Sequence, residues 1–406
     1  MSGPVGEPTR LSGGPGELDA LVTATASFVR SVVLPEDDAH DGDAEAAGGD
    51  ALRLSLQRQA RAAGVYGPHL PVAYDGRGLG MVDRAPVFEA AGYSLFGAVA
   101  LNAAAPDEGN LHLLAVVADS AQRARFLAPL AGGVVRSAFA MTEPAPGAGS
   151  DPSLLVTSAE RGSAGWRISG RKTFITGADG AAFMIVMART SGEPGDAGGA
   201  TMFLVPAETP GLHVGRHVPT MDRSMIGGHC DVVLDGVEVS DDLVLGEVGE
   251  GFRHAQVRLG PARMTHVMRW LGAARRAHDA AVGYAAERVA FGSRLGDLGM
   301  VQRMVAENEI DLAATRALLL EACRELDAGG RGSGSTSVAK AFAGEALYRV
   351  ADRATQICGG LGVTGDLPTA RVLRELRPFR VYDGPTEVHY WSIARRALRQ
   401  AARDRA

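Results

Sequence analysis

The feature that most constrains the fold is a change of pattern that occurs twice along the chain. Up to about residue 135, apolar residues recur at helical spacing. Short runs rich in Val, Ile, Thr and Phe then alternate with Gly, Asp and Pro turns, which is typical of antiparallel strands. Helical periodicity returns afterwards. The sequence therefore predicts an α+β, multi-domain chain with an N-terminal helical domain at 1–138, a middle β-domain at 139–247 and a C-terminal helical bundle at 248–406.

A G-x-G-x-x-G pattern at Gly360, Gly362 and Gly365 raises the question of a dinucleotide site, because Asp383 follows at a suitable spacing. A Rossmann fingerprint must follow a strand and open a helix. Here a helical pattern precedes Gly360, and no β-α-β alternation occurs along the chain. We therefore predict a glycine-rich turn that ends a helix, and no NAD site.

Composition narrows the class of protein. The chain has 406 residues, a formal net charge of −6 and a pI of about 6.0, which disfavours a broad nucleic-acid surface. The three cysteines are far apart and form no Cys-x-x-Cys pair, so we expect buried thiols and no metal site. The Gly- and Pro-rich start lacks the apolar core of a signal peptide, and no run of 18 apolar residues occurs. We expect a cytoplasmic protein that does not enter membranes, with an acidic, solvated connection at residues 35–50.

Seven segments, in order, are similar to motifs of the acyl-CoA dehydrogenase family, and the resemblance covers the chain from about residue 17 to about residue 400. The segments are Phe139-Ala-Met-Thr-Glu-Pro, Gly149-Ser-Asp, Lys172-Thr-Phe-Ile-Thr, Gly249-Glu-Gly-Phe, Glu287-Arg-Val-Ala-Phe-Gly, Gln356-Ile-Cys-Gly-Gly-Leu-Gly and Tyr382-Asp-Gly-Pro-Thr-Glu. The resemblance implies a middle antiparallel β-barrel domain, a C-terminal four-helix bundle and FAD bound between them.

The resemblance also implies which residues hold FAD. Met141 and Thr142 are expected at the pyrimidine edge of the flavin, and the Thr176 hydroxyl near N5. Arg288 and Phe291 are expected to come from an adjacent subunit, which implies a homodimer or homotetramer. The full set of implied cofactor contacts is Phe139, Met141, Thr142, Gly149, Ser150, Phe174, Thr176, Arg288, Phe291, Gln356, Gly360 and Glu387.

The family reaction is α,β-dehydrogenation of an acyl thioester, in which a carboxylate removes the α-proton and a hydride leaves the β-carbon. By position, Asp383 is the implied base, and its own N–H is the implied donor to the thioester carbonyl. Some relatives carry the base immediately before the arginine that maps to Arg263, but Ala262 occupies that place here. The implied substrate contacts are Ser150, Arg263, Tyr382 and Gly384.

Several departures from the family pattern leave alternatives open. Most relatives have Glu in place of Asp383, which shortens the reach of the base by about 1.5 Å. The aspartate branch includes enzymes that handle hydroxylated acyl-CoAs, and a nitroalkane-oxidising relative also has an aspartate there. Gly299 replaces a common glutamine, Phe174 replaces a common tryptophan, and Ala145-Pro146 is an insertion. Acyl length, and CoA versus a carrier-protein thioester, stay open.

We weigh three functions. The first is an acyl-CoA dehydrogenase that passes electrons to an electron-transfer flavoprotein, and the second is an oxidase of the same fold. The third is a DNA-binding relative, because arginines recur every three residues at Arg371, Arg374, Arg377 and Arg380, and Arg395, Arg396 and Arg399 follow. Such a stripe is more often an ion-paired face, and the negative net charge makes nucleic acid an unexpected partner. Taken singly, Asp383-Gly384 could also be an ordinary turn and Arg263 or Arg288 a surface arginine.

Overall fold

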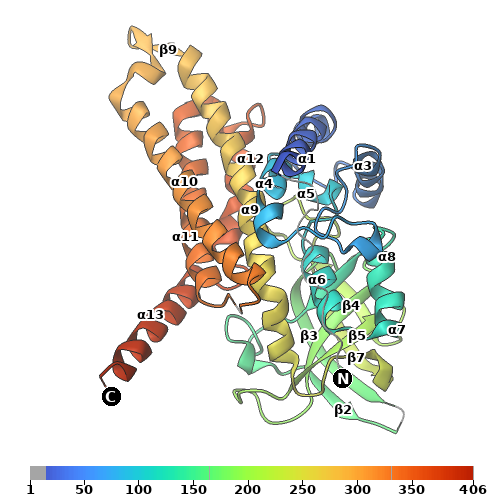
Figure 1. Cartoon of the computed structure of the whole chain (residues 1–406). Coiled ribbons are helices and arrows are strands. Elements are labelled where there is room, and N and C mark those ends of the chain that lie inside the picture. Colours follow the sequence, from blue (N-terminus) through green and yellow to red (C-terminus); the bar gives the residue numbers. More distant parts are fainter. Residues whose placement is uncertain (1–14, 164, 331, 406) are drawn as a thin grey trace.

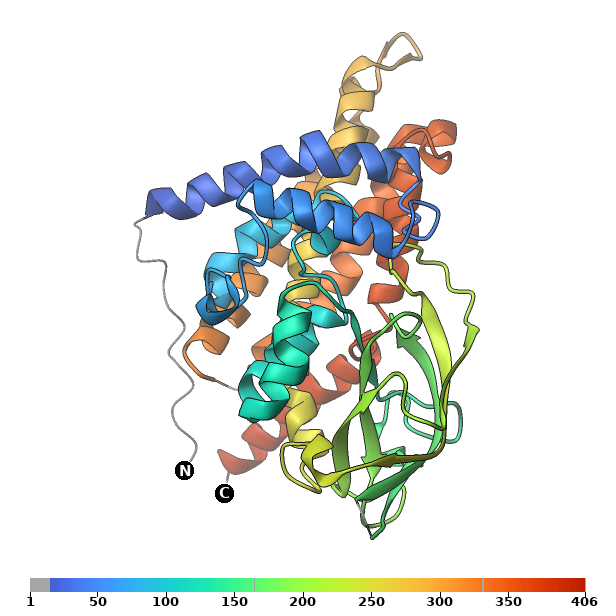
Figure 2. The same cartoon turned by 90° about the vertical axis from the view of Figure 1, so that its right-hand side faces the viewer.

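The fold is known from a computed structural model, which describes residues 15–163, 165–330 and 332–405. Helices of the N-terminal domain lie beside a long-helix bundle, and the sheet of the middle domain packs against the lower part of both (Figure 1; Figure 2). The α+β, three-part fold expected from the sequence is confirmed. The first strand begins at Ser137 and the long helix after the sheet begins at Gly251, and we keep 1–138, 139–247 and 248–406 as the proposed domains.

The N-terminal domain is helical throughout its described part. Its main elements are α1 (Pro15–Phe28), η1 (Val29–Val33), α2 (Leu34–Ala39), α3 (Asp50–Ala62), η2 (Val72–Tyr74), α4 (Met81–Gly92), α5 (Gly97–Ala100), α6 (Asp107–Val117), α7 (Ser120–Gln122), η3 (Arg123–Leu127) and α8 (Ala128–Ala131). Buried apolar side chains such as Leu21, Phe28 and Phe88 hold these helices together.

The expectation of a solvated connection at residues 35–50 is wrong. Asp37, in α2, is fully buried, and its carboxylate lies 2.7 Å from Arg276 Nη1 and 3.3 Å from Arg371 Nε. Burying a carboxylate is favourable only when cations and hydrogen-bond donors compensate its lost hydration. The acidic residues therefore dock the N-terminal domain onto the bundle.

The middle domain is an eight-stranded sheet in the order β6-β7-β3-β2-β4-β5-β8, with β1 paired to β4. Its pairs are antiparallel, except that β1 and β2 each run parallel to β4. The strands are β1 (Ser137–Ala140), β2 (Ser158–Arg161), β3 (Trp166–Thr176), β4 (Phe183–Arg189), β5 (Ala200–Pro206), β6 (Leu212–His217), β7 (His229–Val239) and β8 (Val244–Leu245), with short turns η4 (Pro152–Leu154) and η5 (Asp241–Leu243). Strands β4 and β5 are buried along their whole length, which explains their continuous apolar sequence.

The C-terminal bundle is built around α9 (Gly251–Glu287) and its antiparallel neighbour α10 (Gly299–Asp327). The remaining elements are β9 (Val289–Ala290), β10 (Ser293–Arg294), η6 (Leu295–Asp297), α11 (Ser335–Cys358), η7 (Gly359–Val363), α12 (Pro368–Phe379) and α13 (Thr386–Arg403). The β9–β10 hairpin forms the far tip of the bundle, away from the sheet (Figure 1).

Helices α4 and α9 approach each other closely where two glycines meet. A Cβ on Gly92 would lie 2.1 Å from the Arg269 carbonyl oxygen, and one on Gly272 would lie 2.1 Å from the Glu89 carbonyl oxygen. Any side chain at either position would push the helices apart. The crossing therefore fixes this part of α9 against the N-terminal domain.

The arginine stripe on α12 is mostly ion-paired. Arg371 is almost fully buried against Asp37 and Asp38, Arg374 lies 3.2 Å from Asp41, and Arg380 lies 2.8 Å from Glu345. These cations stabilise domain contacts, so they do not form the exposed phosphate-binding face that a DNA-binding protein needs.

One stretch, Gly16–Ala39, is long and apolar enough to pass a simple test for a membrane-spanning helix. A single such helix is weak evidence, and its far end carries the buried, ion-paired Asp37. The stretch therefore gives no indication of a membrane protein.

Candidate active site

Asp383 and Gly384 form a tight turn between α12 and α13. Both have positive φ angles, 55° and 96°, and a Cβ on Gly384 would lie 2.8 Å from His389 Nε2. Aspartate tolerates the left-handed region better than most residues, and glycine adopts it without strain. Arg263 Nε donates to the Asp383 carbonyl at 2.9 Å, and Lys340 Nζ donates to the Gly384 carbonyl at 2.5 Å. Two cations from the bundle therefore hold the turn.

The Asp383 carboxylate is ionised in a nearly closed environment. Its side chain is 17% exposed, and His266 Nε2 lies 3.1 Å from Oδ2. Burial alone would raise the pKa of Asp383, but His266, Arg258 and Arg263 outweigh burial and hold that pKa well below its usual range. Among the described residues, Oδ2 accepts no hydrogen bond of normal geometry, and the Asp383 N–H has no acceptor. Oδ2 is buried and faces His266, so the groups open to a ligand are Oδ1, which accepts no hydrogen bond among the described residues, and the Asp383 N–H.

His266 has a defined protonation state. Arg269 Nη2 lies 2.5 Å from its Nδ1, and a guanidinium can only donate, so Nδ1 is the acceptor and Nε2 carries the proton. Burial, reinforced by Arg269, lowers the pKa of His266 to about 4. A neutral imidazole therefore directs an N–H at Asp383 at neutral pH.

The Thr142 turn lies at the start of the sheet and is fixed by a buried ion pair. Glu143 and Lys172 meet at 2.9 Å with both side chains fully buried. Glu143 also accepts hydrogen bonds from the backbone N–H groups of Ala148, Val156 and Thr157. Although burial opposes the shift, Lys172 and these donors lower the pKa of Glu143 to about 2.

The positions around this turn suit a flavin. Among the described residues, the N–H groups of Met141 and Thr142 and the Thr142 hydroxyl have no hydrogen-bond partner, while the Thr142 carbonyl accepts from Thr173 N at 3.0 Å. These three donors are therefore available to a ligand. Phe139 is half-buried, and the Arg258 guanidinium carbon lies over its ring, 4.2 Å from the ring centre.

Phe174 and Thr176 lie where strand β3 is irregular. The register between β3 and β7 shifts between Lys172 and Ile175, and Phe174 has a φ of 54° and is 55% exposed. A bulge of this kind re-aims a side chain. The Thr176 hydroxyl lies 2.9 Å from His229 Nδ1, and Asp222 lies 2.9 Å from the other ring nitrogen. These contacts form an Asp–His–Thr chain that the sequence reading missed.

The other expected cofactor residues lie far from this group. Arg288 and the 96% exposed Phe291 are at the tip of the bundle, and Gln356 and Gly360 are exposed at the same end, where α11 stops (Figure 1). Arg288 directly follows the end of α9 and is 25 residues after Arg263, which is about 38 Å along the helix axis. A single FAD molecule cannot contact both sets within one chain.

Three further expected residues are exposed. Gly149 and Ser150 lie on the loop after the Thr142 turn, and Glu387 lies in the first turn of α13. The glycine-rich turn at Gly360 belongs to η7 and follows helix α11, as expected, so it does not open a Rossmann helix. None of the described Cys, His, Asp or Glu side chains forms a group that could hold a metal ion.

The sequence reading did not identify His266, Arg258, Glu143 with Lys172, or His229 with Asp222. His266 carries a signal in hindsight, because it follows Arg263 by three residues and so shares its helical face. His229 and Asp222 lie more than 45 residues from Thr176, so only strand pairing brings them together.

Comparison with known proteins shows similarity to acyl-CoA dehydrogenases along most of the chain. Models of the N-terminal, middle and C-terminal domains of acyl-CoA dehydrogenase match residues 15–134, 138–237 and 249–398. The Mycobacterium tuberculosis protein named "Probable acyl-CoA dehydrogenase FadE2" is 40% identical over 326 residues, covering 79% of this chain and 80% of that protein. Acyl-CoA dehydrogenase family member 11 of Mus musculus is 33% identical over 399 residues, covering 94% of this chain and 50% of that protein. The structure of butyryl-CoA dehydrogenase from Megasphaera elsdenii matches with a TM-score of 0.82 at 27% identity, covering 94% and 98% of the two chains.

Proposed function

The chain belongs to the acyl-CoA dehydrogenase family, and we propose that Asp383 is the base with which it dehydrogenates an acyl thioester between the α- and β-carbons. The family makes the protein an FAD-dependent oxidoreductase. The observation that carries the assignment of the base is the Asp383 carboxylate, which is nearly enclosed and ionised, faces His266 through Oδ2, and accepts no hydrogen bond on Oδ1 among the described residues.

The environment of Asp383 suits proton abstraction in two ways. Enclosure removes the water that would otherwise stabilise the carboxylate, which favours its action as a base. His266 and the arginines keep the carboxylate deprotonated until a substrate arrives, although the same groups lower its pKa and with it its basicity. The Asp383 N–H, which lacks an acceptor among the described residues, is placed to donate to the thioester carbonyl, where negative charge develops as the α-proton leaves. When bound, FAD supplies the acceptor for the hydride that leaves the β-carbon.

The residues around the Thr142 turn would hold the flavin itself. The donors of Met141 and Thr142 suit its pyrimidine edge, and the Thr176 hydroxyl, backed by His229 and Asp222, suits N5. Phe139, Phe174, Gly149, Ser150 and Glu387 complete the proposed cofactor contacts, and Tyr382, Gly384, Ser150 and Arg263 the proposed substrate contacts. Arg263 acts first on the Asp383 carbonyl, so we assign it a positioning role as well.

We propose that the complete FAD site needs two copies of the chain. Arg288, Phe291, Gln356 and Gly360 lie at the end of the bundle opposite the Thr142 turn, so they would serve the cofactor of a neighbouring subunit. Arginine donates two parallel hydrogen bonds to a diphosphate, and exposed glycines allow its close approach. A homodimer or homotetramer follows from this arrangement.

We propose a cytoplasmic enzyme whose electrons pass to an electron-transfer flavoprotein. An oxidase of the same fold, acting on acyl-CoA or a nitroalkane, is the alternative, and the carrier of the acyl group is CoA or a carrier protein.

The test is the anaerobic visible spectrum of the purified protein before and after a panel of acyl-CoAs that includes hydroxylated members. We expect the flavin band to bleach. Persistence of the band with every thioester would overturn the proposed reaction and favour a nitroalkane or another substrate class. Reoxidation of bleached enzyme by O₂ at the turnover rate would identify an oxidase.

A further inference from the structure

A chain of hydrogen bonds ends at the hydroxyl that we propose for flavin N5. Thr176 Oγ1 lies 2.9 Å from His229 Nδ1, and His229 Nε2 lies 2.9 Å from Asp222 Oδ2. The pairing of β3 with β7 sets Thr176 opposite His229, and Asp222 comes from the loop before β7. Because both ring nitrogens of His229 are engaged, its orientation is fixed and its protonation state is what can change.

Asp222 determines which nitrogen of His229 always carries a hydrogen. The Asp222 side chain is 5% exposed, and burial would raise its pKa, but the His229 and Thr220 side chains outweigh burial and hold that pKa below its ordinary value. Asp222 is therefore a carboxylate at neutral pH, and a carboxylate can only accept a hydrogen bond. It follows that His229 Nε2 is protonated and that only Nδ1 can gain or lose a proton.

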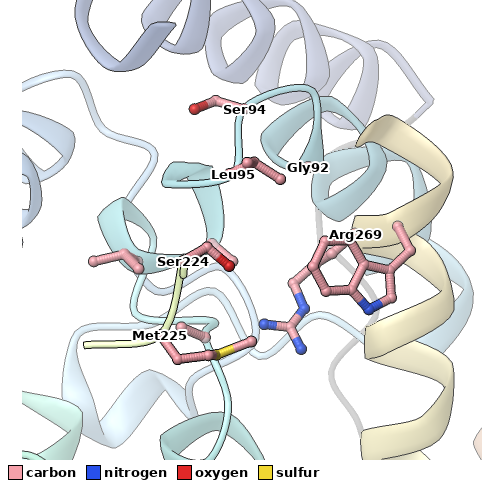
Figure 3. Close-up of a pocket in the computed structure, with 10 residues that line it drawn as sticks. Gly92, Ser94, Leu95, Ser224, Met225 and Arg269 are labelled. Carbon is pink, nitrogen blue, oxygen red and sulfur yellow. The ribbon is translucent and has the colours of Figure 1, made fainter. Parts of the chain in front are cut away.

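The loop that carries Asp222 is anchored to the C-terminal bundle. The Arg223 N–H and the Ser224 hydroxyl donate to the fully buried Glu375 of α12 at 2.5 and 2.6 Å. Ser224 also lines a small cavity together with Arg269 of α9 (Figure 3). The Asp222 carboxylate is therefore held in place where the middle domain meets the bundle.

The Thr176 hydroxyl has a single hydrogen, so the charge of His229 sets the direction in which this hydrogen points. When His229 is neutral, Nδ1 accepts the hydroxyl hydrogen, and only the lone pairs of Oγ1 face a ligand. When His229 is an imidazolium, Nδ1–H donates to Oγ1, and the hydroxyl hydrogen is free to donate to a ligand. Oxidised flavin has a lone pair on N5 and needs a donor, whereas reduced flavin has a hydrogen there and needs an acceptor.

We propose that His229 is a positioning residue that reverses the hydrogen bond between Thr176 and flavin N5, as an imidazolium while the flavin is oxidised and as a neutral ring once it is reduced. The hydride supplies both electrons and the hydrogen on N5. The Nδ1 proton passes to solvent, to which the His229 side chain is 15% exposed, and the Thr176 hydroxyl then turns its own hydrogen toward Nδ1. The inference rests on the proposed flavin contact of Thr176 and is independent of the base and the substrate. At neutral pH the oxidised enzyme keeps this proton, so the change appears in the flavin potential and not in substrate capture.

Other ionisable groups in the described part of the chain surround this site. The ion pairs are His217 with Asp179, Arg136 with Asp50, Arg223 with Asp43 and Asp231 with Arg216. Two further groups lie near Asp222: burial raises the pKa of Tyr382 well above its ordinary value and that of Glu375 to about 7. Because Glu375 titrates in the neutral range, the test has to separate a proton on His229 from one on Glu375.

The first test is the midpoint potential of the FAD enzyme as a function of pH. It is measured from about pH 5.5 to 8.5, where histidines titrate, by dithionite reduction with a redox dye and without any thioester. The slope counts the protons taken up per flavin reduced. We expect wild type to take up about half to one proton fewer than Thr176→Val over part of this range, since reduction and the loss of the His229 proton favour each other.

The Thr176→Val variant removes the hydroxyl and keeps His229, Asp222 and Glu375. Proton uptake that does not act through the hydroxyl is therefore equal in the two proteins and cancels in the comparison. An equal slope for wild type and Thr176→Val would overturn the inference.

Two further variants locate the proton. His229→Asn keeps an amide close to the position of Nδ1 but cannot titrate, so its slope should match that of Thr176→Val. His217→Asn, on the neighbouring strand β6, is the matched control and should keep the slope of wild type. A wild-type slope in His229→Asn, or an equal change in His217→Asn, would assign the proton to another group and overturn the inference.

The last measurement reads the hydrogen bond directly. Apoprotein is titrated at pH 6 with oxidised FAD and with 5-deaza-FAD, in which a C–H group replaces N5. The preference for FAD over 5-deaza-FAD should be about 2- to 10-fold greater in wild type than in Thr176→Val, which is the effect of one hydrogen bond. The same preference in both proteins would overturn the contact. If the protein does not bind FAD, the proposed function fails as well, whereas if thioesters bleach the bound flavin and the slopes are equal, only this inference fails.

Discussion

The inner half of the site, around Asp383 and Thr142, differs from the outer half, around Arg288 and Phe291, in how its side chains are held. Asp383 is enclosed by His266, Arg258 and Arg263, and the Thr142 turn is fixed by the Glu143–Lys172 pair. Phe291 is 96% exposed, and Arg288 and Gly360 are exposed as well. The inner half is therefore organised by one chain before any ligand binds, whereas the outer half, in our proposal, meets its partners on a neighbouring copy of the chain.

The largest effect is expected at the inner carboxylate. Asp383→Asn keeps the shape of the side chain but removes its basicity, so the rate of flavin bleaching by substrate should fall on the order of a thousandfold or more. Stopped-flow reduction under anaerobic conditions measures this rate, and FAD content checks the site. Asp366→Asn, at an exposed position on the loop before α12, is the control and should react as wild type does. A variant that still bleaches at the normal rate would remove Asp383 from the mechanism.

The second prediction tests whether a buried ion pair supports the inner half. Glu143→Gln leaves the Lys172 cation without its partner, which should lower the free energy of unfolding by about 3–5 kcal/mol. Chemical denaturation measures the loss, with Glu160→Gln on exposed β2 as the control.

The sign of the pH dependence follows from the lowered pKa of Glu143. The stabilisation by the ionised Glu143 carboxylate is fully present above its ordinary pKa of 4.5 and is lost as the pH falls toward about 2. The difference in free energy of unfolding between wild type and Glu143→Gln should therefore become smaller over that range. A difference that is small at neutral pH would show that the turn does not depend on this pair.

The third prediction concerns the outer half. Arg288→Ala should weaken FAD binding by about 10- to 100-fold through loss of charge-assisted hydrogen bonds, with little change in the melting temperature of the apoprotein. Reconstitution of apoprotein followed by flavin fluorescence gives the dissociation constant. Arg294→Ala, on the same hairpin, is the matched control. Equal effects of both substitutions would show a general charge effect instead of a specific contact.

The smallest effect is expected from pH in the neutral range. Because the pKa of His266 is lowered to about 4 and that of Asp383 lies below its usual range, neither group should titrate between about pH 5 and 7, and kcat/KM should stay level there. Above about pH 8 it should decline as Lys340, whose pKa burial lowers to about 8, loses the proton that faces the Gly384 carbonyl. A change in the slope of the kcat/KM profile near pH 6.5 would mean that His266 titrates as an ordinary histidine.

Much of the fold could be predicted from local pattern. Helical periodicity, strand-like runs and the position of Gly360 after a helix all depend on neighbouring residues, and each was interpreted correctly. The acidic segment at residues 35–50 was misjudged because its partners, Arg276 and Arg371, lie more than 200 residues away. The composition shows that a segment is acidic, but only the fold shows which cations lie against its carboxylates.

The sequence by itself determined the three-part architecture and the family and pointed to Asp383 as the proposed base, because periodicity and ordered motifs are properties of short stretches. The tertiary structure alone decided what surrounds that base. It set His266 against Asp383 and placed Phe139 against Arg258 near the start of α9, a helix length away from Arg288. The reason is physical: burial, electrostatic environment and distance depend on residues that meet only when the chain is packed.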